Sequence, residues 1–236
     1  ALTALTAQNT VGVQAIHAVP PSFLKAQLES VLDDIGADAI KIGMLHAPEI
    51  VEVVAWALDQ YRPAHVVLDP VMVATSGDRL IAEETVTELV RLLFPRASLI
   101  TPNLDEAEWL LGHRIAGAEA LPAAADALLA LGAQAVLLKG GHLAGTTVVD
   151  WLARPGHSGL RLASERIASH NVHGTGCTLS SAIASHLALG HELEAAVRLA
   201  RDYILSAIAT GAKVRTGQGH GPLNHGHAPQ ATQIIL

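Results

Sequence analysis

The chain has 236 residues, of which 50% are hydrophobic, and it carries a formal net charge of −7 and a mean hydropathy of +0.35. A chain of this length buries a substantial core, its negative charge argues against nucleic acid or an acidic membrane surface as the main partner, and its single cysteine excludes an internal disulfide. No apolar run approaches the roughly 18 residues of a membrane-spanning helix, so we expect a soluble, cytoplasmic, globular protein.

Strand-like and helix-like segments alternate along the chain. Ala1 already lies in a segment with strand character, and residues 11–19 alternate like a strand until two prolines open a helix that extends to about residue 34. Residues 146–152 and 160–163 are predicted to form a hairpin around the turn at 154–156. Further strands are predicted at 37–42, 65–68, 97–100 and 135–138, and further helices at 48–60, 82–93, 104–111, 122–131, 176–189 and 192–211.

The tail at 217–229 is rich in Gly and Pro, which is typical of a loop. It also contains His220, His225 and His227, but no partners for a metal site can be named beside them. We therefore favour a loop over a metal centre in this segment.

This alternation of strands and helices predicts the fold class. Short turns between the elements indicate an α/β protein of three layers, α/β/α, in which a mostly parallel central sheet has helices on both faces and residues 1–236 form a single domain. Ligands bind at the carboxyl ends of the strands in such sheets. Polar or flexible residues follow the predicted strands there, namely Gly43 with Met44, Asp69, Asn103 and Lys139.

The most informative segment is His173-Gly174-Thr175-Gly176-Cys177-Thr178, which opens a predicted helix. Glycines let the backbone approach a ligand closely, and a helix that begins here would direct free N–H groups and a positive dipole end at an anion. The cysteine of this segment would be stabilised as a thiolate. The alternative interpretation is a glycine-rich helix start with a small buried residue.

Each residue at the predicted sheet edge has a structural alternative. Asn103 and Glu106 match a helix capping box, Asp69 stands before a proline as a turn residue would, Lys139 could be a solvated strand end, and Met44 could fill the core. Their convergence on one edge nevertheless favours a nucleotide-phosphate site with a metal ion. The pattern G-x-x-x-x-G-K-[ST] does not occur, which excludes the P-loop class.

These motifs carry a family resemblance. In chain order they are Thr6-Ala7-Gln8-Asn9-Thr10, Lys41-Ile42-Gly43-Met44, Leu68-Asp69-Pro70-Val71-Met72, Thr101-Pro102-Asn103-Leu104-Asp105-Glu106-Ala107, Lys139-Gly140-Gly141-His142 and the segment at 173–178. Together they resemble the hydroxymethylpyrimidine/phosphomethylpyrimidine kinases of thiamine biosynthesis, in the ribokinase-like superfamily, from Ala1 to about Pro222. Sugar kinases of that superfamily usually carry an aspartate base where Cys177 stands.

The resemblance implies that ATP phosphorylates 4-amino-5-hydroxymethyl-2-methylpyrimidine and then its monophosphate, at one site and with Mg²⁺. It implies that Cys177 is the general base and that the amides of Gly174, Thr175, Gly176 and Cys177 donate to the transferring group. It also implies that Asp69, Lys139 and Thr175 lie at the ATP phosphates and that Asn103 and Glu106 hold Mg²⁺ through water. By the same resemblance, Gln8 binds the pyrimidine ring, and Met44 and Val71 make apolar contacts with it. Family members are commonly homodimers, so we expect a homodimer without nucleic-acid or membrane partners.

Two other functions stay open from the sequence. Pyridoxal kinase is a rival because a related branch of these enzymes also has the cysteine, although Gln8 and Met44 favour the pyrimidine. A non-catalytic pyrimidine-binding descendant is less favoured because Cys177, the glycines and the Asn103/Glu106 pair are all present. The family also begins with a strand and a Gly/Ser-rich segment, which we expect to precede Ala1 in the native protein.

Overall fold

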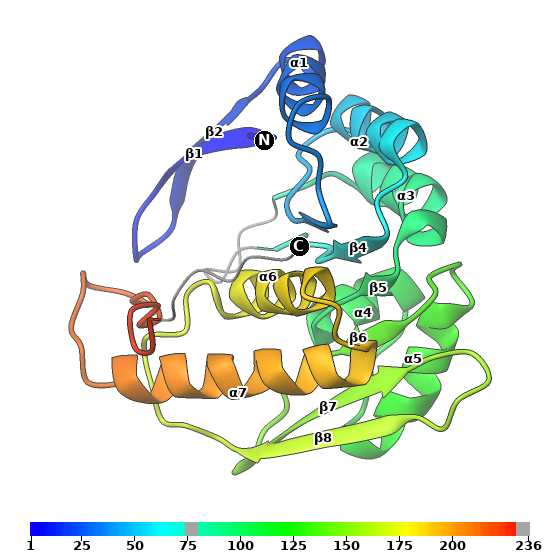
Figure 1. Ribbon diagram of the computed structural model, residues 1–236. Coiled ribbons are helices and arrows are strands. Elements are labelled where there is room, and N and C mark those ends of the chain that lie inside the picture. The colour runs from blue at the N-terminus through cyan, green and yellow to red at the C-terminus, as the bar shows by residue number, and fades with distance from the viewer. Residues whose placement is uncertain (74–79, 230–236) are drawn as a thin grey trace.

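A six-stranded sheet forms the centre of the computed structural model, which describes residues 1–73 and 80–229 (Figure 1). The strand order is β3-β4-β5-β6-β7-β8. The first four of these strands pair in parallel, and β7 and β8 add an antiparallel hairpin at one edge. Their bounds are β3 (Ala39–Ile42), β4 (His65–Leu68), β5 (Leu99–Ile100), β6 (Val136–Leu138), β7 (Thr147–Ala153) and β8 (Leu160–Glu165).

Helices cover both faces of this sheet, which confirms the predicted three-layer α/β fold. Side chains alternate between the faces of a strand, so Val67 of β4 packs with the helices α6 and α7, whereas Leu68 packs with the helices on the other face. The helices are α1 (Pro21–Leu32), α2 (Pro48–Tyr61), α3 (Glu83–Leu92), α4 (Leu104–Leu111) and α5 (Leu121–Leu129) on one side, and α6 (Thr175–Ala188) and α7 (Leu193–Gly211) on the other.

The predicted elements are confirmed, with small shifts at their ends. The helix predicted at 104–111 has the same bounds in the structure, because Asn103 caps its start and Gly112 ends it in a left-handed conformation. The strand predicted at 97–100 begins later, at Leu99, because a 3₁₀ turn (Phe94–Arg96) precedes it. No described helix has both the length and the apolar character needed to cross a membrane.

The first two strands lie outside the central sheet, which the sequence did not predict. β1 (Ala4–Gln8) and β2 (Val13–Ala18) pair only with each other, in an antiparallel sheet whose residues are mostly exposed. This sheet is anchored where the Thr3 hydroxyl donates to the Met44 carbonyl at 2.8 Å. At its other end, the amide of Gly219 in the tail donates to Thr10 Oγ1 at 3.2 Å. The small sheet therefore spans from the loop after β3 to the tail (Figure 1).

Candidate active site

The residues that follow the parallel strands lie side by side. Backbone hydrogen bonds continue past the strand ends: the Asp69 amide donates to the Ile42 carbonyl, and the Lys139 amide donates to the Pro102 carbonyl, each at 2.9 Å. Asn103 and Lys139 also form an isolated parallel bridge. The polar residues predicted at this edge of the sheet are thus held together by the backbone.

A buried ion pair occupies the centre of this edge. Lys139 Nζ lies 2.8 Å from Asp69 Oδ1, which also accepts the Thr101 hydroxyl at 2.9 Å. Burial alone would raise the pKa of Asp69. The charge and hydrogen bond of Lys139, together with the charge of Lys41 and the Thr101 hydroxyl, outweigh burial and hold this pKa below its usual value. Burial likewise lowers the pKa of Lys139 less than the neighbouring carboxylates raise it. Both groups are therefore charged, and Lys139 is not a solvated strand end.

Helix α6 begins directly beside this ion pair. A Cβ atom added to Gly176 would lie 3.0 Å from Lys139 Nζ and 3.7 Å from Asp69 Oδ2. Glycine lets the helix backbone come this close to the lysine without displacing the ammonium group. The sequence segment at 173–178 and the strand-end residues therefore form one site.

The start of α6 offers fewer free amides than the sequence suggested. Gly174 caps the helix with φ +83°, and the amide and the hydroxyl of Thr175 both donate to the Val172 carbonyl, at 3.2 and 2.6 Å. Thr175 is thus engaged in the turn itself. Within the described residues, no backbone or side-chain acceptor is bound by the amides of Gly174, Gly176 and Cys177, so these three remain for a ligand.

Cys177 is a free, exposed cysteine on the first turn of α6. Desolvation raises the pKa of its thiol, and the carboxylates of Asp69 and Glu106 add to this increase, whereas the charges of Lys41 and Lys139 oppose it. The prediction that the helix start lowers this pKa toward neutrality is therefore wrong. The thiol is protonated at neutral pH, because desolvation and these two carboxylates outweigh the charges of Lys41 and Lys139.

Asn103 and Glu106 form the capping box that the sequence predicted. The Glu106 amide donates to Asn103 Oδ1 at 2.9 Å, and the Asn103 amide donates to Glu106 Oε2 at 2.7 Å. Glu106 is only 2% exposed. Desolvation raises its pKa to about 7, and Asp69 contributes to the increase, while Lys139 counters it.

These two residues also fit a hard cation. Lys139 is the one described lysine whose charge acts on Glu106, and Glu106 shares it with Asp69. A further positive charge beside Glu106 would therefore favour its ionised form. Amide and carboxylate oxygens are ligands that Mg²⁺ accepts. Within residues 1–73 and 80–229, however, no group of three or more His, Cys, Asp or Glu could hold a metal ion alone. Phosphate oxygens and water would have to supply the remaining ligands.

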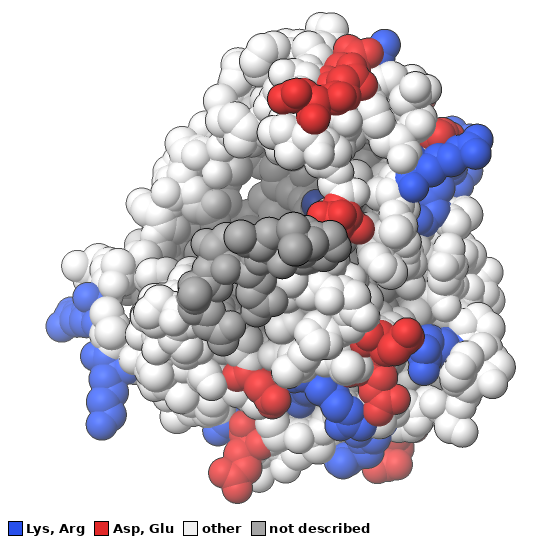
Figure 2. All heavy atoms as spheres, in the orientation of Figure 1, with Lys and Arg blue, Asp and Glu red and all other residues white. Residues whose placement is uncertain are grey.

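Two of the residues predicted to contact the substrate, Met44 and Val71, lie between the central sheet and the β1–β2 sheet. Met44 and Val71 pack in one hydrophobic cluster with Val13 and Ile16 of β2. Gln8, the last residue of β1, is exposed, and its Oε1 accepts the Thr6 hydroxyl at 3.5 Å. The structure thus brings Met44 and Val71 together, and it leaves Gln8 on the exposed strand without a described contact to the ion pair. Figure 2 shows the surface hollowed between the β1–β2 sheet and α1.

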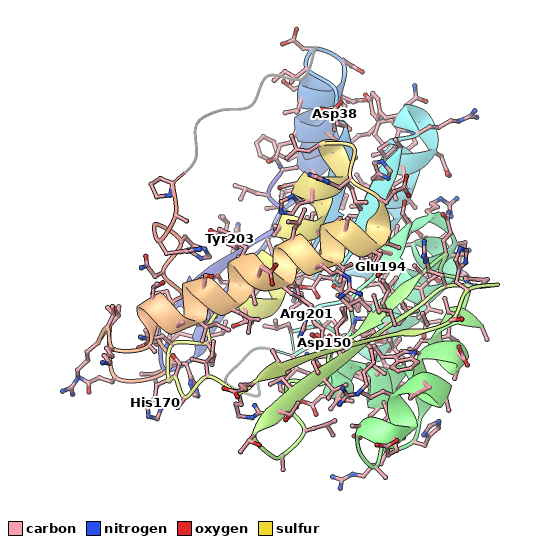
Figure 3. All side chains as sticks on the ribbon, turned by 60° about the horizontal axis from the view of Figure 1, so that its bottom comes forward. Asp38, Asp150, His170, Glu194, Arg201 and Tyr203 are labelled. Carbon is pink, nitrogen blue, oxygen red and sulfur yellow. The ribbon has the colours of Figure 1, made fainter. Side chains whose placement is uncertain are left out.

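Two residues at the site were not predicted from the sequence. Lys41 of β3 was noted only as part of a motif, yet its charge acts on both Asp69 and Cys177. Its signal was a lysine inside an otherwise apolar strand. Asp150 of β7 accepts the Gly140 amide at 2.9 Å and pairs with buried Arg201 of α7 (Figure 3). It carried no signal, because only the fold brings β7 and α7 next to the loop after Lys139.

A cavity of about 480 Å³ opens beside the turn that leads into α6. It does not include the ion pair. Polar side chains and loop backbone line it, from the segment before Gly174 and from the tail: His170, Asn171, Ala212, Val214, Arg215, Thr216, Gly217, Gln218, Gly219 and His220.

The chain matches a known protein family over most of its length. Residues 1–224 match the family described as phosphomethylpyrimidine kinase. The chain is 45% identical over 227 residues to the hydroxymethylpyrimidine/phosphomethylpyrimidine kinase of Rhizobium meliloti, across 96% of this chain and 85% of that protein. It is 50% identical over 224 residues to the thiamine biosynthesis bifunctional protein ThiED of Geobacter sulfurreducens, across 95% of this chain and 45% of that protein. The chain therefore spans less than half the length of this bifunctional relative.

Solved structures agree with the fold. The crystal structure of phosphomethylpyrimidine kinase from Clostridium difficile is 40% identical with a TM-score of 0.76, over 88% of this chain and 84% of that one. The pyridoxal kinase of Staphylococcus aureus in complex with AMP-PCP is 31% identical with a TM-score of 0.86, over 96% of this chain and 81% of that one. The backbone alone does not separate the two kinds of kinase, whereas sequence identity is higher to the pyrimidine kinases.

Proposed function

The chain belongs to the phosphomethylpyrimidine kinase family, phosphotransferases of thiamine biosynthesis, and from this membership we propose which of its residues carry the reaction. In the proposed function, ATP phosphorylates 4-amino-5-hydroxymethyl-2-methylpyrimidine and then its monophosphate at a single site. The observation that carries this assignment is the contact of Gly176 with the Lys139–Asp69 ion pair, because it joins a lysine and free helix amides at one point. Phosphoryl transfer requires such positioning and charge neutralisation.

Lys139 and the start of α6 would hold the transferring phosphoryl group. The amides of Gly176 and Cys177 and the positive end of the helix dipole would take up the charge that develops on this group. Gly174 and Thr175 would shape the turn that aims these amides. Asp69 would act on the phosphates through Lys139, whose position it sets at 2.8 Å.

Asn103 and Glu106 would hold Mg²⁺ through water. Magnesium gives up its hydration shell reluctantly, and both side chains already accept backbone amides in the capping box, which fits an indirect contact. Bound Mg²⁺ would neutralise charge on the ATP phosphates. The nucleoside of ATP would extend into the cavity lined by Asn171 and Arg215, because that cavity adjoins the turn before Gly174.

The acceptor would bind against Met44 and Val71, whose side chains share a cluster with β2. Gln8 would contact the polar edge of the ring with its amide, which can both donate and accept hydrogen bonds. Cys177 would accept the proton of the hydroxymethyl group as transfer begins. Because its thiol has a raised pKa, this proton transfer would be favoured at a pH above neutrality.

We further propose a single-domain, cytoplasmic homodimer. Large hydrophobic side chains are exposed on β1, on the β1–β2 turn and on and beside α1, including Leu5, Val11, Phe23 and Ile35, and a second copy could cover them. Light scattering is expected to give twice the chain mass of 24.6 kDa. A mass of one chain would contradict the dimer.

A side-by-side kinase assay tests the proposed function. The purified protein, with ATP and Mg²⁺, is expected to convert the hydroxymethylpyrimidine to its monophosphate and then to its diphosphate, with a higher kcat/KM than for pyridoxal. A higher kcat/KM for pyridoxal would instead support the rival kinase. Binding of the pyrimidine without any phosphoryl transfer would support a non-catalytic descendant.

A further inference from the structure

Lys41 lies on the face of the sheet that α6 covers. In β3, Ile42 packs into the core on the side of α2 to α5, whereas Ala39 packs with the α6 and α7 cluster. Because side chains alternate along a strand, Lys41 shares the face of Ala39. The lysine therefore starts from the same side of the sheet as the first turn of α6.

The ammonium group of Lys41 folds over the backbone of Gly43. A Cβ atom added to Gly43 would lie 2.9 Å from Lys41 Nζ. Gly43 leads directly to Met44 of the proposed acceptor pocket, and Ile42 is bonded through its carbonyl to the Asp69 amide. The charge thus lies between the acceptor pocket and the ion pair, and it lowers the pKa of both Asp69 and Cys177.

The charges of the two lysines at the site are balanced differently. Lys139 is paired directly with Asp69. In the part of the chain that the structure describes, Lys41 makes no ion pair with any carboxylate. Lys41 is only partly buried, so its charge is available to a ligand that approaches from the side of Met44.

The second phosphorylation poses a different chemical problem from the first. The first acceptor is a neutral alcohol that must lose a proton. The second acceptor is a phosphate monoester, whose second pKa is about 6, so near pH 7 it is mostly a dianion with a nucleophilic oxygen ready. That oxygen forms a bond to the γ-phosphorus of ATP, the bond to the bridging oxygen breaks, and its electron pair leaves with ADP. The obstacle is repulsion between two phosphate groups, which a cation on the acceptor side removes.

We propose that Lys41 binds the phosphate of the monophosphate acceptor and thereby permits the second phosphorylation at the site used for the first. This inference rests on the proposed function and assigns a residue to its second step. It also divides the work at the site: Cys177 serves the alcohol, Lys41 serves the phosphate, and Lys139 serves the nucleotide in both steps.

The test compares the two acceptors in one set of variants. Lys41→Met is expected to lower kcat/KM for the monophosphate by about 10- to 100-fold more than for the alcohol, because a charge-assisted hydrogen bond is lost. Lys41→Arg keeps the charge and should retain most of the second activity. Lys25→Met removes an exposed lysine of α1 and is the control for a change of net charge. Cys177→Ala should shift the ratio of the two activities in the opposite direction.

Calorimetric titration without ATP makes the test independent of turnover. Lys41→Met should weaken binding of the monophosphate by about 10- to 100-fold and binding of the alcohol far less. An equal loss for both ligands, or no loss for either, would overturn the proposal. Thermal melting would reveal whether Lys41→Met folds. If it does not, the salt dependence of monophosphate affinity is measured in wild type and Lys41→Arg. Affinity that is insensitive to salt in both proteins would also overturn the proposal. Failure of the proposed function would show separately, as absent transfer to the alcohol in wild type.

Discussion

Cys177 shows how a single residue depends on opposing local effects. The helix start favours its thiolate, but desolvation and the nearby carboxylates raise the pKa of the thiol. A protonated thiol must give up its proton before it can accept one from the substrate. The rate of the first phosphorylation should therefore rise with pH above neutrality, whereas the second, which needs no base, should not.

The general-base role of Cys177 is tested by two substitutions. Cys177→Ala is expected to lower turnover with the alcohol by about 10²–10⁴-fold, the usual contribution of a positioned base, with nearly unchanged melting temperature and ATP binding. Cys177→Asp should recover part of the rate, because a carboxylate can accept the same proton. Steady-state kinetics and thermal melting measure both. An active alanine variant beside an inactive, destabilised aspartate variant would show that the thiol only fills space.

Glu106 should make the stability of the protein depend on pH. Its pKa is about 7 in the folded protein, against a usual value of 4.5. Between these values the folded state binds more protons than the unfolded state, so stability falls as pH rises, by about 3 kcal/mol in total. In buffer with a metal chelator, Glu106→Gln should remove this loss. Urea unfolding of wild type and Glu106→Gln at pH 5 and pH 8 measures this loss of stability.

Comparing Glu106→Gln with wild type isolates the contribution of Glu106 to the pH dependence of stability. His186, whose pKa burial lowers, titrates in both proteins and cancels in the difference. Kinetics supply the second readout: Glu106→Gln should keep the helix cap, since Gln can still accept the Asn103 amide, yet lower turnover and raise the Mg²⁺ requirement. Wild-type activity and magnesium dependence would show that Glu106 is a cap alone.

At the scale of elements, β7 and α7 support the loop that carries Lys139. Gly140 has no room for a side chain, because an added Cβ would lie 1.9 Å from the Val149 carbonyl oxygen. Its amide is held by Asp150, which is in turn paired with Arg201. Further along the loop, Arg166 donates to the carbonyls of Gly141 and Gly145, at 2.9 and 2.8 Å. Elements far from the reacting atoms thus fix the backbone next to Lys139.

Removing one charge of the Asp150–Arg201 pair should lower the free energy of unfolding more than removing both charges together. Asp150→Asn leaves the buried guanidinium of Arg201 without a counter-charge and is expected to destabilise the protein by about 3–5 kcal/mol. The double variant Asp150→Asn with Arg201→Met should regain part of this loss, since no buried charge remains. Urea unfolding of the single and double variants measures the interaction free energy between residues 150 and 201. A double variant less stable than Asp150→Asn alone would contradict this account.

At the scale of the whole molecule, the proposed site includes residues of both sheets. The central sheet and α6 contribute the ion pair, the free amides and Cys177, while β2 contributes apolar side chains to the cluster around Met44 and Val71. The two sheets meet where Thr3 donates to the Met44 carbonyl. Acceptor and nucleotide would therefore approach the ion pair from different parts of the fold.

Much of the fold could be predicted from the sequence because local signals determine it. Proline and glycine mark the ends of the elements, and the apolar spacing separates strands from helices, so even the capping box at Asn103 was predicted correctly. The edge of the sheet was also predictable, since parallel strands bring their carboxyl ends together. The separate β1–β2 sheet was not, because its strand pattern does not specify a partner strand.

The sequence by itself determined the fold class, the order of elements and the set of polar residues at the strand ends, because these depend on neighbours along the chain. Only the tertiary structure decided that the pKa values of Cys177 and Glu106 are raised, that Gly176 lies close to Lys139, and where Lys41 and Asp150 are positioned. The physical reason is that desolvation and Coulomb interactions depend on distances in space, between residues that lie far apart in sequence.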